Sequence, residues 1–180
     1  VVGPGNNGGD GLDAAIHLQR AGKHVEVLLA AAPAAGDARD ALRRARAAGI
    51  LIDPSRPTPL QTQDLAIDAL LGIGSRAVLD GPLHAAIQAL AGLPCPVLAV
   101  DLPSGLDADT GQTPGACVRA DHVLCLLTLK PGLFTAHGRD HAATVWLDSL
   151  GIDLSGESPQ AWLGGAQAAT VPRRQHSQHK

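Results

Sequence analysis

Aromatic residues are scarce in this chain of 180 residues, making up only 2% of the composition. The hydrophobic core must therefore be built from Ala, Val, Leu and Ile, which usually fill packed α/β layers. Hydrophobic residues account for 45% of the chain and charged residues for 17%, a balance that excludes a wholly disordered protein. The length suits a single domain.

Signals for membranes, nucleic acids and disulfides are also missing. No apolar run is long enough to span a bilayer and no signal peptide is present, so we expect no membrane association. A net charge of −3 provides no basic face, so we expect no nucleic-acid partner. The cysteines (Cys95, Cys117, Cys125) are too few for a disulfide framework and fit no zinc spacing, which favours buried thiols in a reducing cytoplasm. The histidines show no metal-ligand spacing either.

Both ends of the sequence suggest a piece of a longer protein. The chain starts without Met just before a glycine-rich loop, so we expect an N-terminal truncation. The last stretch, VPRRQHSQHK, becomes polar and basic, which predicts that residues 166–180 are a linker or the start of another domain. Residues 1–165 are the expected domain.

Strand and helix patterns alternate along the chain. Helices are expected at Asp10–Ala21, Asp37–Ala48 and Gly81–Ala91. Strands are expected at Val1–Val2, His24–Leu29, Ile50–Ile52, Leu65–Leu70, Val97–Val100, Val123–Leu127 and Thr144–Leu147. This alternation predicts an α/β protein, specifically a three-layer α/β/α Rossmann-like fold with a mostly parallel sheet.

Three polar segments begin where apolar runs stop. They are Gly3–Gly11, Asp68–Gly74 and Asp101–Gly105. Ligands of open parallel sheets bind beyond the carboxyl ends of the strands. We therefore expect these segments, although distant in sequence, to meet at one edge of the sheet and form a single site.

The first segment opens Gly3-Pro4-Gly5-Asn6-Asn7-Gly8, a G-x-G-x-x-G pattern found in dinucleotide-binding loops. Asp10 at the expected helix start would repel a pyrophosphate, and Glu26 lies in mid-strand rather than at a strand end. A NAD dehydrogenase is therefore disfavoured, and a P-loop is excluded because no Gly-Lys-Ser/Thr follows. A tight turn with Asp10 as the helix N-cap would explain one or two of these residues, but not the whole set.

Residues 1–22, VVGPGNNGGDGLDAAIHLQRAG, resemble the signature of the YjeF N-terminal family, the NAD(P)H-hydrate epimerases. The segments Asp68–Gly74 (DALLGIG), Ala99–Asp107 (AVDLPSGLD) and Thr128–Leu133 (TLKPGL) resemble that family in the same order. The likeness extends to about Asp153. The closing His179-Lys180 resembles the opening of the dehydratase domain that follows in bifunctional members.

The resemblance implies an isomerase that repairs hydrated NADH and NADPH (NADHX and NADPHX) by interconverting their R and S forms at nicotinamide C6. It also implies a homodimer and a potassium ion held by Asn7, Asp68 and Ser104. Oxygen ligands suit such a hard cation. Taken singly, Asp68 could instead make a strand-end hydrogen bond, and Ser104 could cap a turn. Ser104 is no hydrolase nucleophile, because it lacks the G-x-S-x-G elbow.

The resemblance also implies where the substrate binds. Its expected contacts are Asn6, Asn7, Gly8, Gly9, Asp10, Asp101 and the loop Gly72, Ile73, Gly74, Ser75, Arg76, Ala77 and Val78. Ile73 and Ser75-Arg76 depart from the family pattern, which leaves the local contacts open. Arg76 either reaches a substrate phosphate or is solvated. Lys130 either faces the site or caps the sheet edge.

Asp101 is the candidate catalytic residue. Loss of the C6 hydroxyl, a transient iminium and return of water on the other face require a group that moves a proton. The alternative is an Asp that caps the turn before Pro103. The competing function is a non-catalytic scaffold, as in relatives of mRNA-decapping enhancers, which lose the Asn-Asn-Gly-Gly-Asp loop and the later Asp. This chain keeps Asn6–Asp10, Asp68 and Asp101, which favours an enzyme.

Overall fold

The computed structural model describes residues 1–33, 35–53, 57–73, 81–153, 155–159 and 161–164. Its helices are α1 (Asn6–Arg20), α2 (Gly36–Ala47), α3 (Gly81–Ala91) and the short α4 (Gly138–His141), with a 3-10 turn at Pro131–Leu133. Its strands are β1 (Glu26–Val27), β2 (Leu51–Ile52), β3 (Ala66–Asp68), β4 (Val97–Val100), β5 (Ala120–Leu126) and β6 (Ala142–Asp148).

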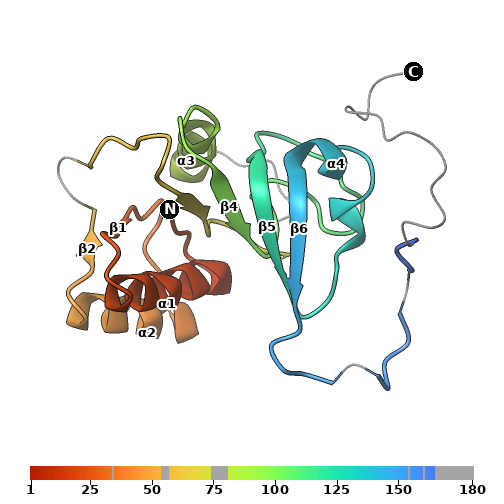
Figure 1. Ribbon diagram of the computed structural model, residues 1–180, viewed down its shortest axis with the longest axis horizontal. Coiled ribbons are helices and arrows are strands. Elements are labelled where there is room, and N and C mark those ends of the chain that lie inside the picture. The colour runs from red at the N-terminus through yellow and green to blue at the C-terminus, as the bar shows by residue number, and fades with distance from the viewer. Residues whose placement is uncertain (34, 54–56, 74–80, 154, 160, 165–180) are drawn as a thin grey trace.

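All strand pairings in the described residues are parallel. Strands β3, β4, β5 and β6 form a four-stranded sheet in that order, and β1 pairs with β2. Val2 bridges both Leu29 and Ala69, so the segment before α1 lies between the two groups of strands. Figure 1 shows β4, β5 and β6 side by side and pointing the same way. Their carboxyl ends therefore share one edge.

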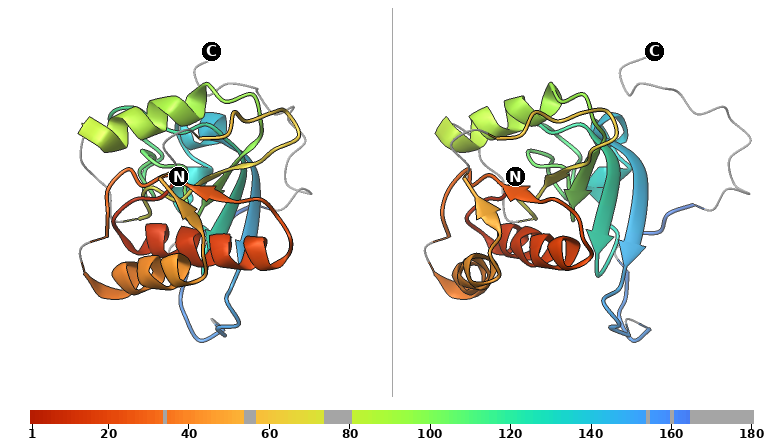
Figure 2. Two further views of the ribbon diagram at one scale, coloured as in Figure 1. Left: turned by 90° about the vertical axis from the view of Figure 1, so that its left-hand side faces the viewer. Right: turned by 60° about the vertical axis from the view of Figure 1, so that its left-hand side comes forward.

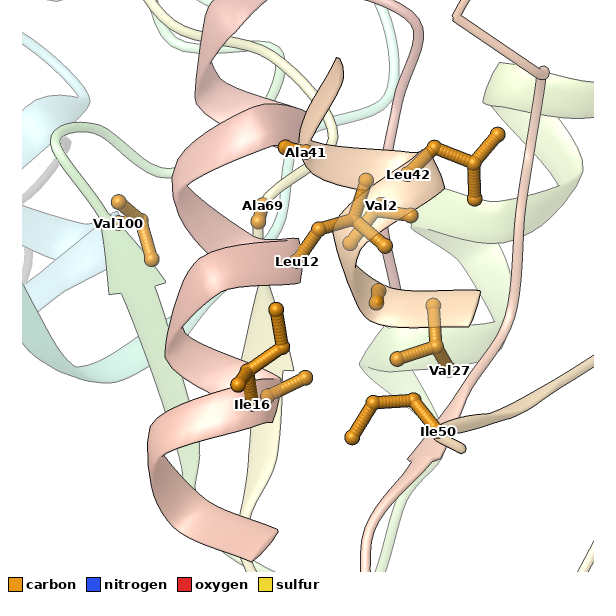
Figure 3. Close-up of a cluster of buried hydrophobic side chains, with 11 residues drawn as sticks. Val2, Leu12, Ile16, Val27, Ala41, Leu42, Ile50, Ala69 and Val100 are labelled. Atoms are coloured by element: carbon orange, nitrogen blue, oxygen red, sulfur yellow. The ribbon is translucent and has the colours of Figure 1, made fainter. Parts of the chain in front are cut away.

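Helices α1 and α2 cover one face of the sheet. Leu12 and Ile16 of α1 pack with Leu42 of α2 and with Ala69 and Val100 beside the sheet. Figure 3 shows these side chains gathered between the helices and the strands. All buried members of this cluster are Ala, Val, Leu or Ile, as the scarcity of aromatics predicts.

Helix α3 covers the opposite face. Its Ile87 and Leu90 are buried with Ala66 of β3 and Val97 of β4. Figure 2 shows α3 on one side of the strands and α1 with α2 on the other. The three-layer α/β/α arrangement with parallel strands is thus confirmed.

The first helix begins earlier than the sequence predicts. It starts at Asn6 rather than Asp10, with Gly5 in the N-cap position and no side-chain cap. Asp10 therefore lies inside the helix, and both its expected place at the helix start and its alternative role as N-cap are wrong. Glycines at positions 8, 9 and 11 disfavour a helix by propensity, and tertiary packing overrides that preference.

Strand lengths also differ from expectation. The strands expected at His24–Leu29 and Leu65–Leu70 shrink to β1 and β3, whereas those at Val123–Leu127 and Thr144–Leu147 lengthen to β5 and β6. Pairing with a neighbour sets these limits: β1 has beside it only the short β2 and a single bridge from Val2 to Leu29, whereas β5 is paired on both sides and β6 pairs along β5.

The described cysteines are free thiols. Cys95 and Cys125 are buried as expected, whereas Cys117 is half-buried. Burial, aided by the charge of Asp68, raises the pKa of Cys117 to about 12, so its thiol stays protonated. Among the described helices, none combines the length and apolar character needed to cross a membrane.

Candidate active site

Three sequence-distant segments meet beside the carboxyl ends of β3 and β4. Asp68 is the last residue of β3, Asp101 follows β4 directly, and Asn7 lies in the first turn of α1. Gly72 lies between them: a Cβ added there would be 3.5 Å from the Asn7 Cβ and 3.8 Å from Asp101 Oδ2. The structure therefore brings Asn7, Gly72 and Asp101 together at one rim.

Asp68 and Ser104 form a buried network beneath this rim. The Ser104 hydroxyl donates to Asp68 Oδ1 at 2.6 Å, and the Ser104 backbone N–H donates to Oδ2 at 2.8 Å. The backbone N–H of Leu70 donates to Oδ1 at 3.2 Å. Burial raises the pKa of Asp68, and these hydrogen bonds oppose that rise. The carboxylate is 0% exposed, so it gains from any nearby positive charge.

The Asn7 amide is only half used. Its Nδ2 donates to the Leu71 carbonyl at 2.9 Å, while its Oδ1 is buried and accepts no hydrogen bond from the described residues. The backbone of Leu71 connects Asn7 to the Asp68–Ser104 network, because the Leu71 N–H donates to Ser104 Oγ at 3.0 Å. A buried amide oxygen without a donor, linked through Leu71 to a hydroxyl and a buried carboxylate, fits a hard cation.

Softer metals find less support in the described residues. No group of three or more His, Cys, Asp or Glu side chains gathers there as a metal site would require. Asn7, Asp68 and Ser104 are the oxygen set that the family resemblance implies for a potassium ion. Its role as a ligand set remains a prediction.

Asp101 is held in an unusual backbone conformation. Its φ of 67° lies in the left-handed region, which costs energy for a residue with a side chain. Its N–H donates to the Leu124 carbonyl at 2.8 Å, which fixes the turn against β5. This strained turn points the carboxylate along the edge of the sheet, where Oδ1 accepts from the Leu126 N–H at 3.2 Å.

Lys130 forms an ion pair with Asp101. Its ammonium donates to Asp101 Oδ1 and, at 2.6 Å, to the Leu126 carbonyl. The two side chains are 13% and 14% exposed, so water screens the pair only partly. Lys130 therefore does both things that the sequence left open: it faces the site through Asp101, and it caps the sheet edge through the last carbonyl of β5. Sequence spacing gave no signal for this contact.

Asn6 and Asp10 lie at the mouth of the site and are exposed, whereas Asn7, Gly8 and Gly9 are buried. Partial desolvation raises the pKa of Asp10, and the negative charges of Asp13 and Asp101 add to the rise. Two carboxyl groups thus share the rim in different surroundings, Asp101 with a cation beside it and Asp10 with neighbouring anions.

The predicted substrate loop is seen only in part. Gly72 lies against Asn7 and Asp101, and the Ile73 side chain is 60% exposed beside it. The other predicted contacts in this loop, Gly74, Ser75, Arg76, Ala77 and Val78, lie outside the described residues. An exposed Ile at this rim provides an apolar surface next to the polar site.

The sequence model of the family described as YjeF-related protein N-terminus matches residues 1–132. The chain belongs to this family. The matched region contains all the residues of the candidate site described above: Asn7, Asp68, Asp101, Ser104 and Lys130.

Curated relatives carry two kinds of name. The chain is 40% identical over 159 residues to a bifunctional NAD(P)H-hydrate repair enzyme of Leishmania infantum, and 38% identical over 169 residues to one of Escherichia coli. The matches cover 85% and 93% of this chain but only 28% and 32% of those proteins. An NAD(P)H-hydrate epimerase of Pirellula staleyi is 40% identical, with 84% of this chain and 71% of that protein covered.

A solved structure shares the fold. The crystal structure of the yeast protein YNL200c matches with a TM-score of 0.69 at 22% identity, covering 84% of this chain and 65% of that chain. At this identity the likeness supports the fold alone.

Proposed function

We propose that this domain interconverts the R and S forms of hydrated NADH and NADPH. A curated relative of which the match covers 71% is named for this epimerisation, and two longer relatives are named as bifunctional NAD(P)H-hydrate repair enzymes. One observation supports the proposal most strongly. Lys130 holds the Asp101 carboxylate at the edge of the sheet where Asn7 and Gly72 also lie.

The reaction needs a negative charge and a mobile proton. As the C6 hydroxyl leaves, the ring nitrogen shares its lone pair with C6 and an iminium cation develops. The Asp101 carboxylate, held by Lys130, stabilises that cation through space. Partial desolvation raises the pKa of Asp10, which makes Asp10 a second candidate beside Asp101 for protonating the departing oxygen and accepting a proton from the returning water.

A potassium ion is the second part of the proposal. Asn7, Asp68 and Ser104 would hold it, since they combine an unpaired amide oxygen, a buried carboxylate and a hydroxyl. When bound, the ion supplies positive charge that compensates the buried Asp68 and attracts the anionic phosphates of a dinucleotide.

Potassium chloride is expected to raise the midpoint of thermal unfolding relative to choline chloride at equal ionic strength. A ligand at ten times its dissociation constant stabilises a protein by about 1.4 kcal/mol, which corresponds to roughly 3–6 °C for a domain of this size. The shift is expected to vanish in Asn7→Ala and Asp68→Asn, and to persist in Asp40→Asn on the exposed side of α2. Equal shifts in all four proteins would contradict the ion site.

The epimerase activity is tested with an R/S mixture of hydrated NADH and an S-specific dehydratase. The dehydratase alone is expected to stop once the S form is consumed, and adding the full protein is expected to carry conversion through the R form. Recovery of NADH is read by absorbance. Conversion that still stops at the S fraction would favour the non-catalytic scaffold.

A homodimer and a following dehydratase domain stay predictions. An apolar edge favours the dimer, because Trp146 and Leu147 on the outermost strand β6 are 57% and 51% exposed. Two relatives named as bifunctional favour the second domain. A cytoplasmic location is likewise a prediction.

A further inference from the structure

We propose that Lys130 is a positioning residue that turns Asp101 toward the substrate. This inference rests on the proposed epimerisation and assigns a role to a residue outside the predicted ligand and substrate sets. The Lys130 ammonium and the Leu126 N–H both occupy Asp101 Oδ1. Oδ2 is the oxygen that lies nearest Gly72, on the side where the Asn7 loop closes the rim. Occupying one oxygen therefore directs the other into the site.

The lysine is itself held in place by the turn after β5. Leu127 has a left-handed φ of 65°, and the Thr128 N–H donates to the Leu126 carbonyl at 2.8 Å, so the chain reverses at this point. The Leu126 carbonyl also accepts from the Lys130 ammonium at 2.6 Å. The Leu126 carbonyl at the end of β5 and Asp101 Oδ1, which itself accepts from the Leu126 N–H, thus hold the end of a long side chain that would otherwise sample many rotamers.

The charges argue for orientation rather than direct stabilisation of the reaction. A lysine ammonium repels the iminium that develops on the nicotinamide ring, so on its own it would slow the reaction. It helps only by acting through Asp101, whose carboxylate lies between the two cations and must present one oxygen in a fixed direction. Small errors in the placement of such a group cost about 10–100-fold in rate.

Replacing Lys130 by Met, which keeps the apolar stem and removes the ammonium, is expected to lower kcat about 10–100-fold with little change in KM. Lys130→Arg, which restores a cationic donor, is expected to recover part of the loss. In an Asp101→Asn background, Lys130→Met is expected to add almost nothing, because its effect passes through Asp101. An equal further fall in that background would overturn the inference, and so would a wild-type rate in Lys130→Met. Lys23→Met, at an exposed site, is the matched control.

A labelling experiment tests the contact without using the reaction. Acetylation of the full protein by an N-hydroxysuccinimide ester, followed by mass spectrometry, measures the reactivity of each lysine. Hydrogen bonds to a charged group are worth about 1.5–3 kcal/mol, so Lys130 is expected to react at least about tenfold more slowly than Lys23. Asp101→Asn is expected to speed labelling at Lys130 and leave Lys23 unchanged.

The two experiments separate the two proposals. Labelling at Lys130 that is the same in wild type and Asp101→Asn would overturn the positioning role, whatever the activity. Protected Lys130 in a protein that does not epimerise its substrate would contradict the proposed function while leaving the ion pair intact. Circular dichroism of each variant shows whether a loss reflects unfolding.

Discussion

Replacing Asp101 by Asn is expected to lower kcat for epimerisation about 10²–10⁴-fold. The amide matches the carboxylate in size, but it removes the negative charge that faces the developing cation. It also leaves the Lys130 ammonium, only 13% exposed, without its anionic partner. The measurement is the rate at which R-hydrate becomes available to an S-specific dehydratase, at saturating substrate.

The matched control is Asp40→Asn on α2. Asp40 also pairs with a cation, Arg43, at 2.9 Å, but these side chains are 44% and 71% exposed, against 14% and 13% for Asp101 and Lys130. Exposed pairs of this kind contribute about 0–1 kcal/mol to stability, so neither fold nor rate is expected to change. If Asp101→Asn keeps a near wild-type rate while remaining folded, the charge at this position has no part in the chemistry.

The positions of the candidate acidic residues could be predicted because they follow from where strands stop. Asp68 ends β3 and Asp101 follows β4, each at the point where an apolar run gives way to polar residues. In a parallel sheet such points share one edge, so the proximity of these segments can be predicted without knowing how the side chains pack.

The contact between Lys130 and Asp101 could not be predicted in the same way. The contact depends on two residues with left-handed backbone, Asp101 and Leu127. Neither is a glycine, the residue type from which such a turn is usually predicted. It also depends on the long lysine side chain folding back on its own strand end. A local pattern contains no information about either event, which is why Lys130 stayed open between two interpretations.

The start of α1 was mispredicted for a related reason. Helix propensity favours a start at Asp10, after Gly8 and Gly9, whereas the helix includes both of these glycines as well as Gly11. These glycines allow α1 to approach its neighbours closely. A Cβ at Gly11 would be 2.5 Å from the Ala69 Cβ, and one at Gly9 would be 3.2 Å from the Ala38 Cα. The first turn of the helix therefore lies nearly against the backbone of its neighbours, and this packing brings Asn7 into the site.

Replacing Gly8 by Ala is expected to destabilise the protein by about 3 kcal/mol or more, because its Cβ would lie 2.0 Å from the Gly3 carbonyl oxygen. Gly3 cannot move aside, since its N–H donates to the Ala69 carbonyl at 3.0 Å and its own Cα lies against the Leu70 backbone. Alanine favours a helix over glycine by about 1 kcal/mol, which is smaller than the cost of the clash. Unfolding in urea, followed by circular dichroism, measures the difference.

Gly5→Ala in the same loop is the control for this substitution. Gly5 occupies the N-cap with φ −93° and ψ −172°, an extended conformation open to any residue, and no atom lies within 4 Å of an added Cβ. Its replacement is expected to change the free energy of unfolding by no more than about 1 kcal/mol. If both variants lose equal stability, the cost belongs to glycine flexibility in the loop as a whole. A large loss confined to Gly8 instead identifies the close approach of α1 to Gly3 as the feature that sets the site's geometry.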